Sequence, residues 1–298
     1  MRETENVNKQ TWIQFGFAKI LEVLSPLIKS DELYLKIYFF IYMGKWIDFS
    51  NMKTFSEKVQ WLKMHNTDPI FTVMADKYAS KQFVEDKLGP GYTFPLLGVW
   101  DKFEEIDFDK LPDKFVLKTN HDSGGVWIIK DKSKADFASI EKEIKKRQKK
   151  NYYYLGREYP YKNIPRKIIA EKYMEEAENG GLKDYKFFCF DGKPTYIQVD
   201  IDRFTNHRRD YYDTDWELMD FGVLYHRSYQ RMPPPPHLAE MIEIARTLSQ
   251  GLRFLRVDLF NLNGKVYVGE LTFHPGGGVE IITPKEWEYK LGALINTD

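Results

Sequence analysis

Three pairs of short apolar runs, each pair joined by a turn sequence, constrain the fold of this chain more than any other feature. The pairs are residues 115–118 with 126–130, residues 184–190 with 194–199, and residues 255–259 with 266–271. Their turns are His121–Gly125, Asp191-Gly192-Lys193 and residues 261–265. Apolar runs of this length around glycine-containing turns predict β-hairpins, the second with a type I′ turn. The chain is therefore expected to build antiparallel sheet.

Helices are expected around these hairpins. Residues 1–50 are predicted to be helical, and either Thr54 or Ser56 is suited to cap a short amphipathic helix that ends at Met64. One helix is expected from Pro69 to the Gly89-Pro90-Gly91 turn. Charged residues 133–150 and residues 237–251 form two further predicted helices. Together with the hairpins, these helices predict an α+β fold with a helical N-terminal extension.

Composition limits the class of protein. The 298 residues are 43% hydrophobic and 16% aromatic, which is enough to bury a large core. Lysine and arginine number 44, and so do aspartate and glutamate, so no global basic field points to nucleic acid and none is expected as a partner. The single cysteine, Cys189, lies in an apolar run and excludes an internal disulfide framework. It fits a reducing cytosol, so a cytoplasmic protein is expected.

The N-terminal region leaves two interpretations open. Its start is polar and acidic, which does not fit a signal peptide, and its apolar stretches 12–28 and 33–46 are interrupted by charges. The first stretch has a helical apolar stripe that includes Phe17, Ile20 and Leu24. This helix packs on the body of the protein, or it lies on the inner membrane face with Lys19 and Lys29 at the lipid headgroups.

Two other segments also leave alternatives open. Basic residues 145–150 end a predicted helix, where they are either solvated and favoured by the helix dipole or in contact with an anionic partner. The segment from Tyr152 to Tyr161 holds five tyrosines, whose flat rings and hydroxyls suit either sugar rings or a packed lid.

Charged residues on the hairpins indicate a nucleotide site. Lys118 ends an apolar run directly before the glycine turn, and a cation beside such a turn can hold phosphates. Asp258 and Glu270 lie on the two strands of the last hairpin, where two carboxylates can hold Mg²⁺. Neither a Ser-His-Asp pattern nor a Cys/His metal cluster is present to support a hydrolase.

The order of these motifs carries a family resemblance. The stretches that carry it are Thr54–Leu62, Ala75–Tyr78, Phe115–Lys118, His121–Gly125, Asp184–Phe188, Gly269–Phe273 and Glu286-Trp287. In this order they resemble the ATP-grasp superfamily, and most closely its TupA-like branch. That branch comprises bacterial proteins tied to the synthesis of teichuronopeptide, capsule and other surface polysaccharides.

The resemblance implies two α+β lobes that clasp ATP between them. The expected divisions are a helical N-terminal segment at 1–50 and an associated region at 51–114. A small nucleotide-binding lobe at 115–175 and a metal and substrate lobe at 176–298 would follow.

The resemblance also implies roles for individual residues. The implied nucleotide-binding set is Lys77, Lys118, the phosphate loop Asp122, Ser123, Gly124 and Gly125, the adenine hinge Glu171, Lys172, Tyr173 and Met174, the ribose carboxylate Glu178, and Lys186. Asp258 and Glu270 would bind Mg²⁺, and Arg203 and Arg256 would hold the γ-phosphate or an acyl-phosphate, because a guanidinium matches an oxyanion in pairs. Thr272 departs from the family pattern, which has asparagine at this position.

The implied activity is that of an ATP-dependent ligase that forms a carbon–nitrogen bond. An amino acid or amine would be joined to the carboxylate of a glycan, or of a nucleotide-linked or lipid-linked sugar. Weaker substrate predictions fall on His207, Arg208, Thr272 and His274. Two alternatives remain at this point: a glycosyltransferase of surface glycan synthesis, and a kinase of a sugar or lipid hydroxyl that uses the same ATP site.

Overall fold

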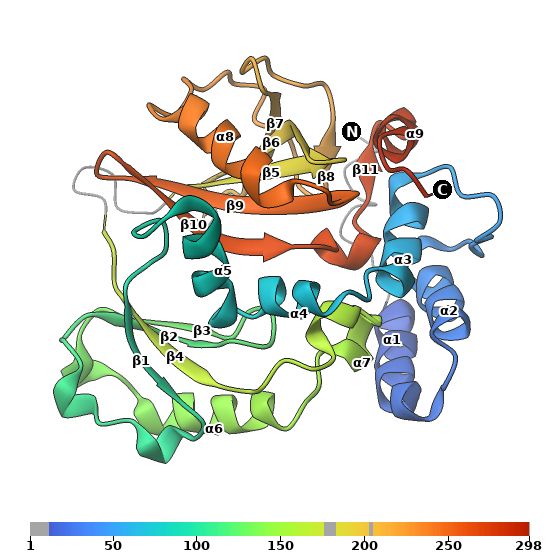
Figure 1. Cartoon of the computed structure of the whole chain (residues 1–298). Helices are drawn as coiled ribbons and strands as arrows, with labels where there is room; N and C mark the ends of the chain where they lie inside the picture. Colours follow the sequence, from blue (N-terminus) through green and yellow to red (C-terminus); the bar gives the residue numbers. More distant parts are fainter. Residues whose placement is uncertain (1–11, 176–182, 203–204, 298) are drawn as a thin grey trace.

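The computed structural model describes residues 12–175, 183–202 and 205–297. Its fold is α+β, as predicted. Two antiparallel sheets lie one above the other in Figure 1, and helices cover their outer faces. The N-terminal helices pack at one side of both sheets, next to the C-terminal helix (Figure 1).

The first sheet has the strand order β1-β4-β2-β3. Its strands are β1 (Leu96–Trp100), β2 (Phe115–Thr119), β3 (Val126–Ile129) and β4 (Ile168–Lys172). Helix α6 (Phe137–Gln148) covers one face, where the buried side chains of Phe115 and Leu117 pack with Ile140 and Ile144. Because side chains alternate along a strand, Lys118 and Glu171 belong to the opposite face. The first predicted hairpin is confirmed, and β1 joins its sheet from the region N-terminal to residue 115.

The second sheet has the strand order β10-β9-β5-β6-β7. Its strands are β5 (Asp184–Phe190), β6 (Lys193–Ile201), β7 (Arg208–Asp213), β9 (Phe254–Leu262) and β10 (Lys265–Thr272). Helix α8 (Leu238–Ser249) covers one face and buries Cys189, so the predicted core position of this thiol is confirmed. Burial raises the pKa of Cys189 to about 12.

The two predicted hairpin turns of this sheet, β5–β6 and β9–β10, use left-handed backbone. Asp191 and Gly192 have φ of 49° and 71°, which fits the predicted type I′ turn. The turn after β9 is tighter than the predicted residues 261–265. It needs only Asn263 and Gly264, with φ of 50° and 73°, and β9 continues through Leu262.

The helix expected from Pro69 to Gly89 is wrong as one unit. The chain forms α4 (Pro69–Ala75) and α5 (Ala79–Leu88), with a break at Asp76–Tyr78. Asp76 is buried, and its Oδ1 accepts hydrogen bonds from Asn120 Nδ2 and from the Tyr78 amide, both at 2.8 Å. These bonds replace helical ones at the break. As a result, Lys77 leaves the helix direction and reaches toward both sheets.

The described N-terminal segment is mostly helical up to Met43, as predicted, but residues 44–50 are not helical although helix was expected there. It contains α1 (Trp12–Leu24), a 3₁₀ turn at Ser25–Leu27, and α2 (Asp31–Met43). Helix α3 (Phe55–His65) follows, and Thr54 caps it in a capping box with Glu57. Arg157 anchors this segment, since its buried guanidinium donates to the carbonyls of Ser25 and Ile28 at 2.6 and 2.7 Å.

The tyrosine-rich segment packs in the described structure. It forms α7 (Tyr153–Gly156) and a 3₁₀ turn at Tyr159–Tyr161. The rings of Tyr153 and Tyr161 are buried, and the Tyr153 hydroxyl donates to Asp31 of α2 at 2.6 Å. Tyr153 therefore holds α2 to α7, while Tyr161 packs into the core of the second sheet.

Several elements were not predicted. They include strand β7, the short pair β8 (Gly222–Val223) and β11 (Ile282–Thr283), and helix α9 (Glu286–Ala293). The remaining 3₁₀ turns are Phe103–Glu105, Phe108–Lys110, Lys132–Lys134 and Pro275–Gly278. Two-residue strands and short polar strands carry too little alternation to stand out in sequence.

Within the described ranges, no helix combines the length and the apolar character that a membrane crossing requires.

Candidate nucleotide and metal site

Lys118 lies in a buried charge cluster on the open face of the first sheet. Glu171 of β4 accepts from Lys118 Nζ through Oε2 and from Lys81 Nζ of α5 through Oε1, both at 2.5 Å. Burial raises the pKa of Glu171, but the charges of Lys118 and Lys81 outweigh it and hold that pKa below its usual value. The three groups thus form a charged cluster with an excess of one positive charge, which suits an anionic ligand.

Lys77 connects the two sheets. Its backbone amide donates to the Asn120 carbonyl at 3.2 Å. Its Nζ donates to the Asp122 carbonyl at 2.5 Å and lies 3.4 Å from Glu270 Oε1 on β10. One ammonium group therefore contacts the glycine turn of the first sheet and the edge strand of the second.

The turn between β2 and β3 is closed by Asp122. Its Oδ1 accepts from Thr119 Oγ1, and its Oδ2 accepts from Arg147 Nη1 of α6 at 2.7 Å. Gly125 has no room for a side chain, since a Cβ there would lie 1.8 Å from Thr119 Oγ1. The Asp122 carboxylate is thus bound by other side chains of the protein, while Ser123 and Gly124 are exposed at the tip of the turn.

Polar side chains cross the whole second sheet in one line, which we call the polar row. Cross-strand partners run from β10 to β7 without a gap, so all five belong to one face. Its members are Glu270, Asp258, Lys186, Gln198 and Tyr211. The structure therefore brings the two predicted metal carboxylates and Lys186 together as neighbours.

Arg256 holds Asp258 from the same strand. Its Nε and Nη2 donate to Asp258 Oδ1 and Oδ2 at 2.7 and 2.8 Å, and Nη2 also lies 3.1 Å from Thr272 Oγ1. Lys186 pairs with Asp184, and its Nζ lies 3.6 Å from Asp258 Oδ2. Burial lowers the pKa of Arg256, but the carboxylates of Asp258, Glu270 and Glu280 hold it above its usual value. Both predicted metal carboxylates are thus matched by cations of the chain.

The donor set fits a magnesium ion that travels with phosphates. In the described part of the chain, no group of three or more histidine, cysteine, aspartate or glutamate side chains is arranged to hold a metal alone. Asp258 and Glu270 are direct cross-strand partners that supply hard oxygen ligands. Mg²⁺ is ordinarily held by one or two carboxylates together with substrate phosphates and water, so two carboxylates suffice.

The remaining predicted residues are dispersed. Lys172, Tyr173 and Met174 follow Glu171 at the end of β4, while Glu178 and Arg203 lie outside the described residues. His207 Nε2 lies 3.0 Å from Asp200 Oδ1, and Arg208 donates to the Arg227 carbonyl.

His274 lies in the core and not on a surface that a substrate reaches. Its side chain is 0% exposed, and its Nδ1 lies 3.3 Å from Glu158 Oε2. Burial lowers the pKa of His274.

Several charged residues near the site were missed by the sequence reasoning. They are Lys81, Arg147, Asp200 and Arg209. Lys81 lies one helical turn after Lys77 in sequence, which is a weak signal. The run from Arg208 to Asp213 shows no polar–apolar alternation, so the strand that carries Arg209 left no clear signal in the sequence.

Comparison with known proteins shows the family of this chain. The family model described as TupA-like ATPgrasp matches residues 57–296, which is most of the chain. The chain belongs to the TupA-like ATP-grasp family. The ATP-grasp fold and the resemblance seen in the sequence are therefore confirmed. A search of curated proteins finds no match.

Solved structures that are similar to this TupA-like chain include amino-acid ligases. D-alanine–D-alanine ligase from Bacillus anthracis, complexed with ATP, is 20% identical over 67% of this chain and 55% of its own, with a TM-score of 0.41. The Helicobacter pylori enzyme is 16% identical over 81% and 69%, with a TM-score of 0.41. Phosphoribosylamine–glycine ligase from Thermotoga maritima is 15% identical over 76% and 51%, with a TM-score of 0.42.

These likenesses carry no weight beside the family match, because the TM-scores are low. The chain spans 55% and 63% of the lengths of the two Bacillus anthracis structures it matches.

Replacing Glu171 by glutamine should destabilise the protein and change its acid sensitivity. The variant leaves Lys118 and Lys81 without their shared carboxylate, so unfolding at neutral pH should need about 3–5 kcal/mol less. A depressed carboxyl pKa stabilises the fold above the unfolded-state value of 4.5, and this stabilisation is lost as the pH falls through the folded-state value. The difference between the wild type and the variant should therefore shrink below about pH 4.5.

Urea unfolding followed by circular dichroism between pH 3 and pH 8 measures this effect. Glu175→Gln is the control, because Glu175 pairs with Lys114 where both side chains are about half exposed. That variant should change the free energy of unfolding by less than about 0.5 kcal/mol. Equal stability of Glu171→Gln and the control at pH 7 would contradict the cluster's importance.

Proposed function

We propose that this protein is an ATP-dependent ligase that joins an amino acid or amine to a carboxylate of a cell-surface glycan or its precursor. The carboxylate is that of a uronic acid, and the route is an acyl-phosphate. The observation that supports this most is the arrangement of charge. Lys77 links the glycine turn, which follows Lys118 on the first sheet, to Glu270 of the polar row on the second.

The first sheet would bind the nucleotide. Lys118 and Lys77 would contact phosphate oxygens, and the exposed amides near Ser123 and Gly124 would approach them closely. Val126 and Ile128 belong to the same face as Lys118 and are 42% and 55% exposed, so they offer an apolar surface to adenine. The segment from Glu171 to Met174 would border the adenine edge, as the family resemblance implies.

The second sheet would hold the reacting groups. Asp258 and Glu270 would bind Mg²⁺, which stabilises charge on the transferring phosphoryl group when it is bound. Arg256 and Lys186 lie beside these carboxylates and would hold the phosphate of the acyl-phosphate. Thr272 already accepts from Arg256, so in place of the family asparagine it would orient that guanidinium.

The glycan assignment rests on the family. TupA-like proteins are tied to teichuronopeptide and capsule synthesis, and a uronic acid supplies the carboxylate that an ATP-grasp site activates. We therefore propose a nucleotide-linked or lipid-linked sugar acid as one substrate. The cytoplasm, where ATP is available, is the proposed compartment.

A membrane contact through the N-terminal helices belongs to the same proposal. Val23 of α1 and Leu27 of the following turn are each 76% exposed, and Phe15, Phe17 and Ile20 of α1 are more than half exposed. Exposed apolar side chains gathered on one short segment favour an interaction site. Lys19 and Lys29 lie along the same segment, so we propose the headgroups of an anionic membrane as the partner.

Lys118→Ala should weaken the binding of Mg-ATP at least tenfold, because it removes an ammonium group on the strand that leads into the glycine turn. Isothermal titration calorimetry measures the affinity, and circular dichroism checks the fold. The control is Lys134→Ala, whose side chain is 83% exposed and pairs with the neighbouring Asp131. Wild-type affinity in Lys118→Ala would refute the nucleotide assignment.

Hydroxylamine trapping tests the ligase reaction. Protein, Mg-ATP, hydroxylamine and a panel of uronic acids and uronic-acid glycans should yield hydroxamate and ADP. Asp258→Asn should reduce both by about 100-fold or more while some nucleotide affinity remains, because it removes one of the two Mg²⁺ carboxylates. The exposed Asp215→Asn serves as control.

Other product patterns would favour the alternatives. ADP with a phosphorylated sugar and no hydroxamate would indicate a kinase. A sugar transferred without consumption of ATP would indicate a glycosyltransferase.

The protein should co-sediment with vesicles that contain phosphatidylglycerol and much less with neutral phosphatidylcholine vesicles. The double variant Val23→Ser, Leu27→Ser should lose most of this binding, because it removes two of the most exposed apolar side chains. Tyr289→Ser on α9, an exposed aromatic position, is the control. Equal binding of the double variant and the wild type would contradict the membrane contact.

A further inference from the structure

Glu280 is a partly buried carboxylate that has no close ionic partner among the described residues. It follows the 3₁₀ turn Pro275–Gly278, and its side chain is 27% exposed. Among the described residues its ion pair is with Arg209, whose Nη1 lies 3.9 Å from Glu280 Oε1. Arg209 is already bound by Asp200, with 2.7 Å between Nε and Oδ1. Because a partly desolvated carboxylate is costly unless it is paired, Glu280 is suited to receive a cation from outside the chain.

The turn before Glu280 holds its carboxylate in place. Gly276 has φ of 57°, and a Cβ there would lie 2.3 Å from Glu280 Cδ, so the side chain lies directly against the turn. On the other side, Lys63 Nζ of α3 donates to the Gly277 carbonyl at 2.8 Å, and Gln60 Nε2 donates to the Gly278 carbonyl at 3.0 Å. A turn held in this way limits where the Glu280 carboxylate points.

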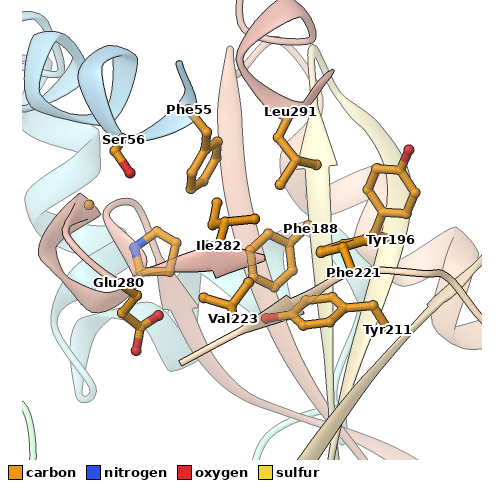
Figure 2. A pocket seen from close by; sticks show the side chains of 12 residues that line it. Phe55, Ser56, Phe188, Tyr196, Tyr211, Phe221, Val223, Glu280, Ile282 and Leu291 are labelled. Atoms are coloured by element: carbon orange, nitrogen blue, oxygen red, sulfur yellow. The ribbon is translucent and has the colours of Figure 1, made fainter. Parts of the chain in front are cut away.

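The carboxylate of Glu280 lies at the edge of an aromatic pocket and turns away from its rings (Figure 2). Phe188, at the centre of that view, is the cross-strand partner of Arg256, and Tyr211 is the last member of the polar row. Burial lowers the pKa of Arg256, and the negative charges of Asp258, Glu270 and, with a smaller effect, Glu280 raise it above its usual value. Glu280 is thus within electrostatic reach of the residues that we propose to hold the acyl-phosphate.

We propose that Glu280 binds the ammonium group of the amine substrate and accepts the proton which that group must lose. This inference rests on the proposed ligase function and extends it to the second substrate. The substrate class is a primary amine, protonated at neutral pH. Its positive charge completes the incomplete pairing of Glu280.

The step balances in atoms and charge. The ammonium group gives one proton to the Glu280 carboxylate, and the freed lone pair of nitrogen attacks the acyl carbon. The carbon–nitrogen bond forms, the bond from carbon to the phosphate oxygen breaks, and phosphate leaves with that electron pair. The second proton of nitrogen goes to the departing phosphate. The products are an amide, hydrogen phosphate and a protonated Glu280.

The experiment compares two nucleophiles in Glu280→Gln. Hydroxylamine is mostly neutral near pH 7.5 and needs no proton acceptor before it attacks, whereas glycine, glutamate and methylamine carry an ammonium group. With Mg-ATP and the uronic-acid panel, amide formation by the variant should fall about 100-fold. Hydroxamate formation should fall at least tenfold less. The amide rate of the variant should recover as the pH rises, because the amine then loses its proton to solvent.

Two further variants separate this role from a structural one. Glu286→Gln is the matched control, since it removes an exposed carboxylate that pairs with Lys290 on α9. Glu280→Asp keeps the charge and should recover part of the amide rate. Thermal unfolding of each variant verifies its fold.

Each of the other outcomes would contradict either the role of Glu280 or the proposed ligase function. If Glu280→Gln lowers both products equally, or neither, Glu280 serves only as a partner of Arg209 and the inference is wrong. A wild-type protein that forms hydroxamate but no amide with any amine also overturns it. A wild-type protein that forms no hydroxamate overturns the proposed ligase function itself, and the amine site falls with it.

Discussion

The pairing of buried charges is the constraint on which the rest of this structure depends. A carboxylate or ammonium group removed from water needs an opposite charge, and the charged groups named below at the candidate site each have one. Glu171 forms ion pairs with Lys118 and Lys81, Asp258 with Arg256, and Glu270 with Lys77. The phosphate-binding cations that we propose are thus held in position by carboxylates, so a ligand would find them already oriented and would replace only part of their pairing.

The break between α4 and α5 allows one of these ion pairs, Lys77 with Glu270, to connect the two sheets. The hydrogen bonds of Asp76 end one helix and start the next, which frees Lys77 to reach Asp122 on one side and Glu270 on the other. A continuous helix would direct Lys77 elsewhere on a regular spiral and leave the two sheets without this contact. A buried carboxylate far from the proposed chemistry therefore sets the geometry of a residue that is part of it.

The features predicted well from sequence are those set by local chemistry. The hairpins follow from apolar runs around Asp191-Gly192 and the His121–Gly125 turn. The helix cap was expected at Thr54 or Ser56, and the structure uses Thr54. Lys118, Asp258 and Glu270 stood out because they interrupt apolar strands. By contrast, the helix break at Asp76 depends on Asn120, which lies far away in sequence. Lys81 forms an ion pair with Glu171, and Arg209 forms one with Asp200. Both pairs join different elements of the fold, so no local sequence pattern predicts them.

Asp200 and Glu280 both lie near Arg209, but the two carboxylates differ in how completely their charge is paired. Asp200 has a close guanidinium and a histidine, and although burial raises its pKa, Arg209 lowers it to about 2. The negative charge of Asp200 is therefore balanced by Arg209 within the protein. Glu280 shares the same arginine at a longer distance and keeps more contact with solvent. Of two carboxylates around one guanidinium, the nearer one positions the arginine, and the farther one retains the capacity to bind a cation that arrives from solution.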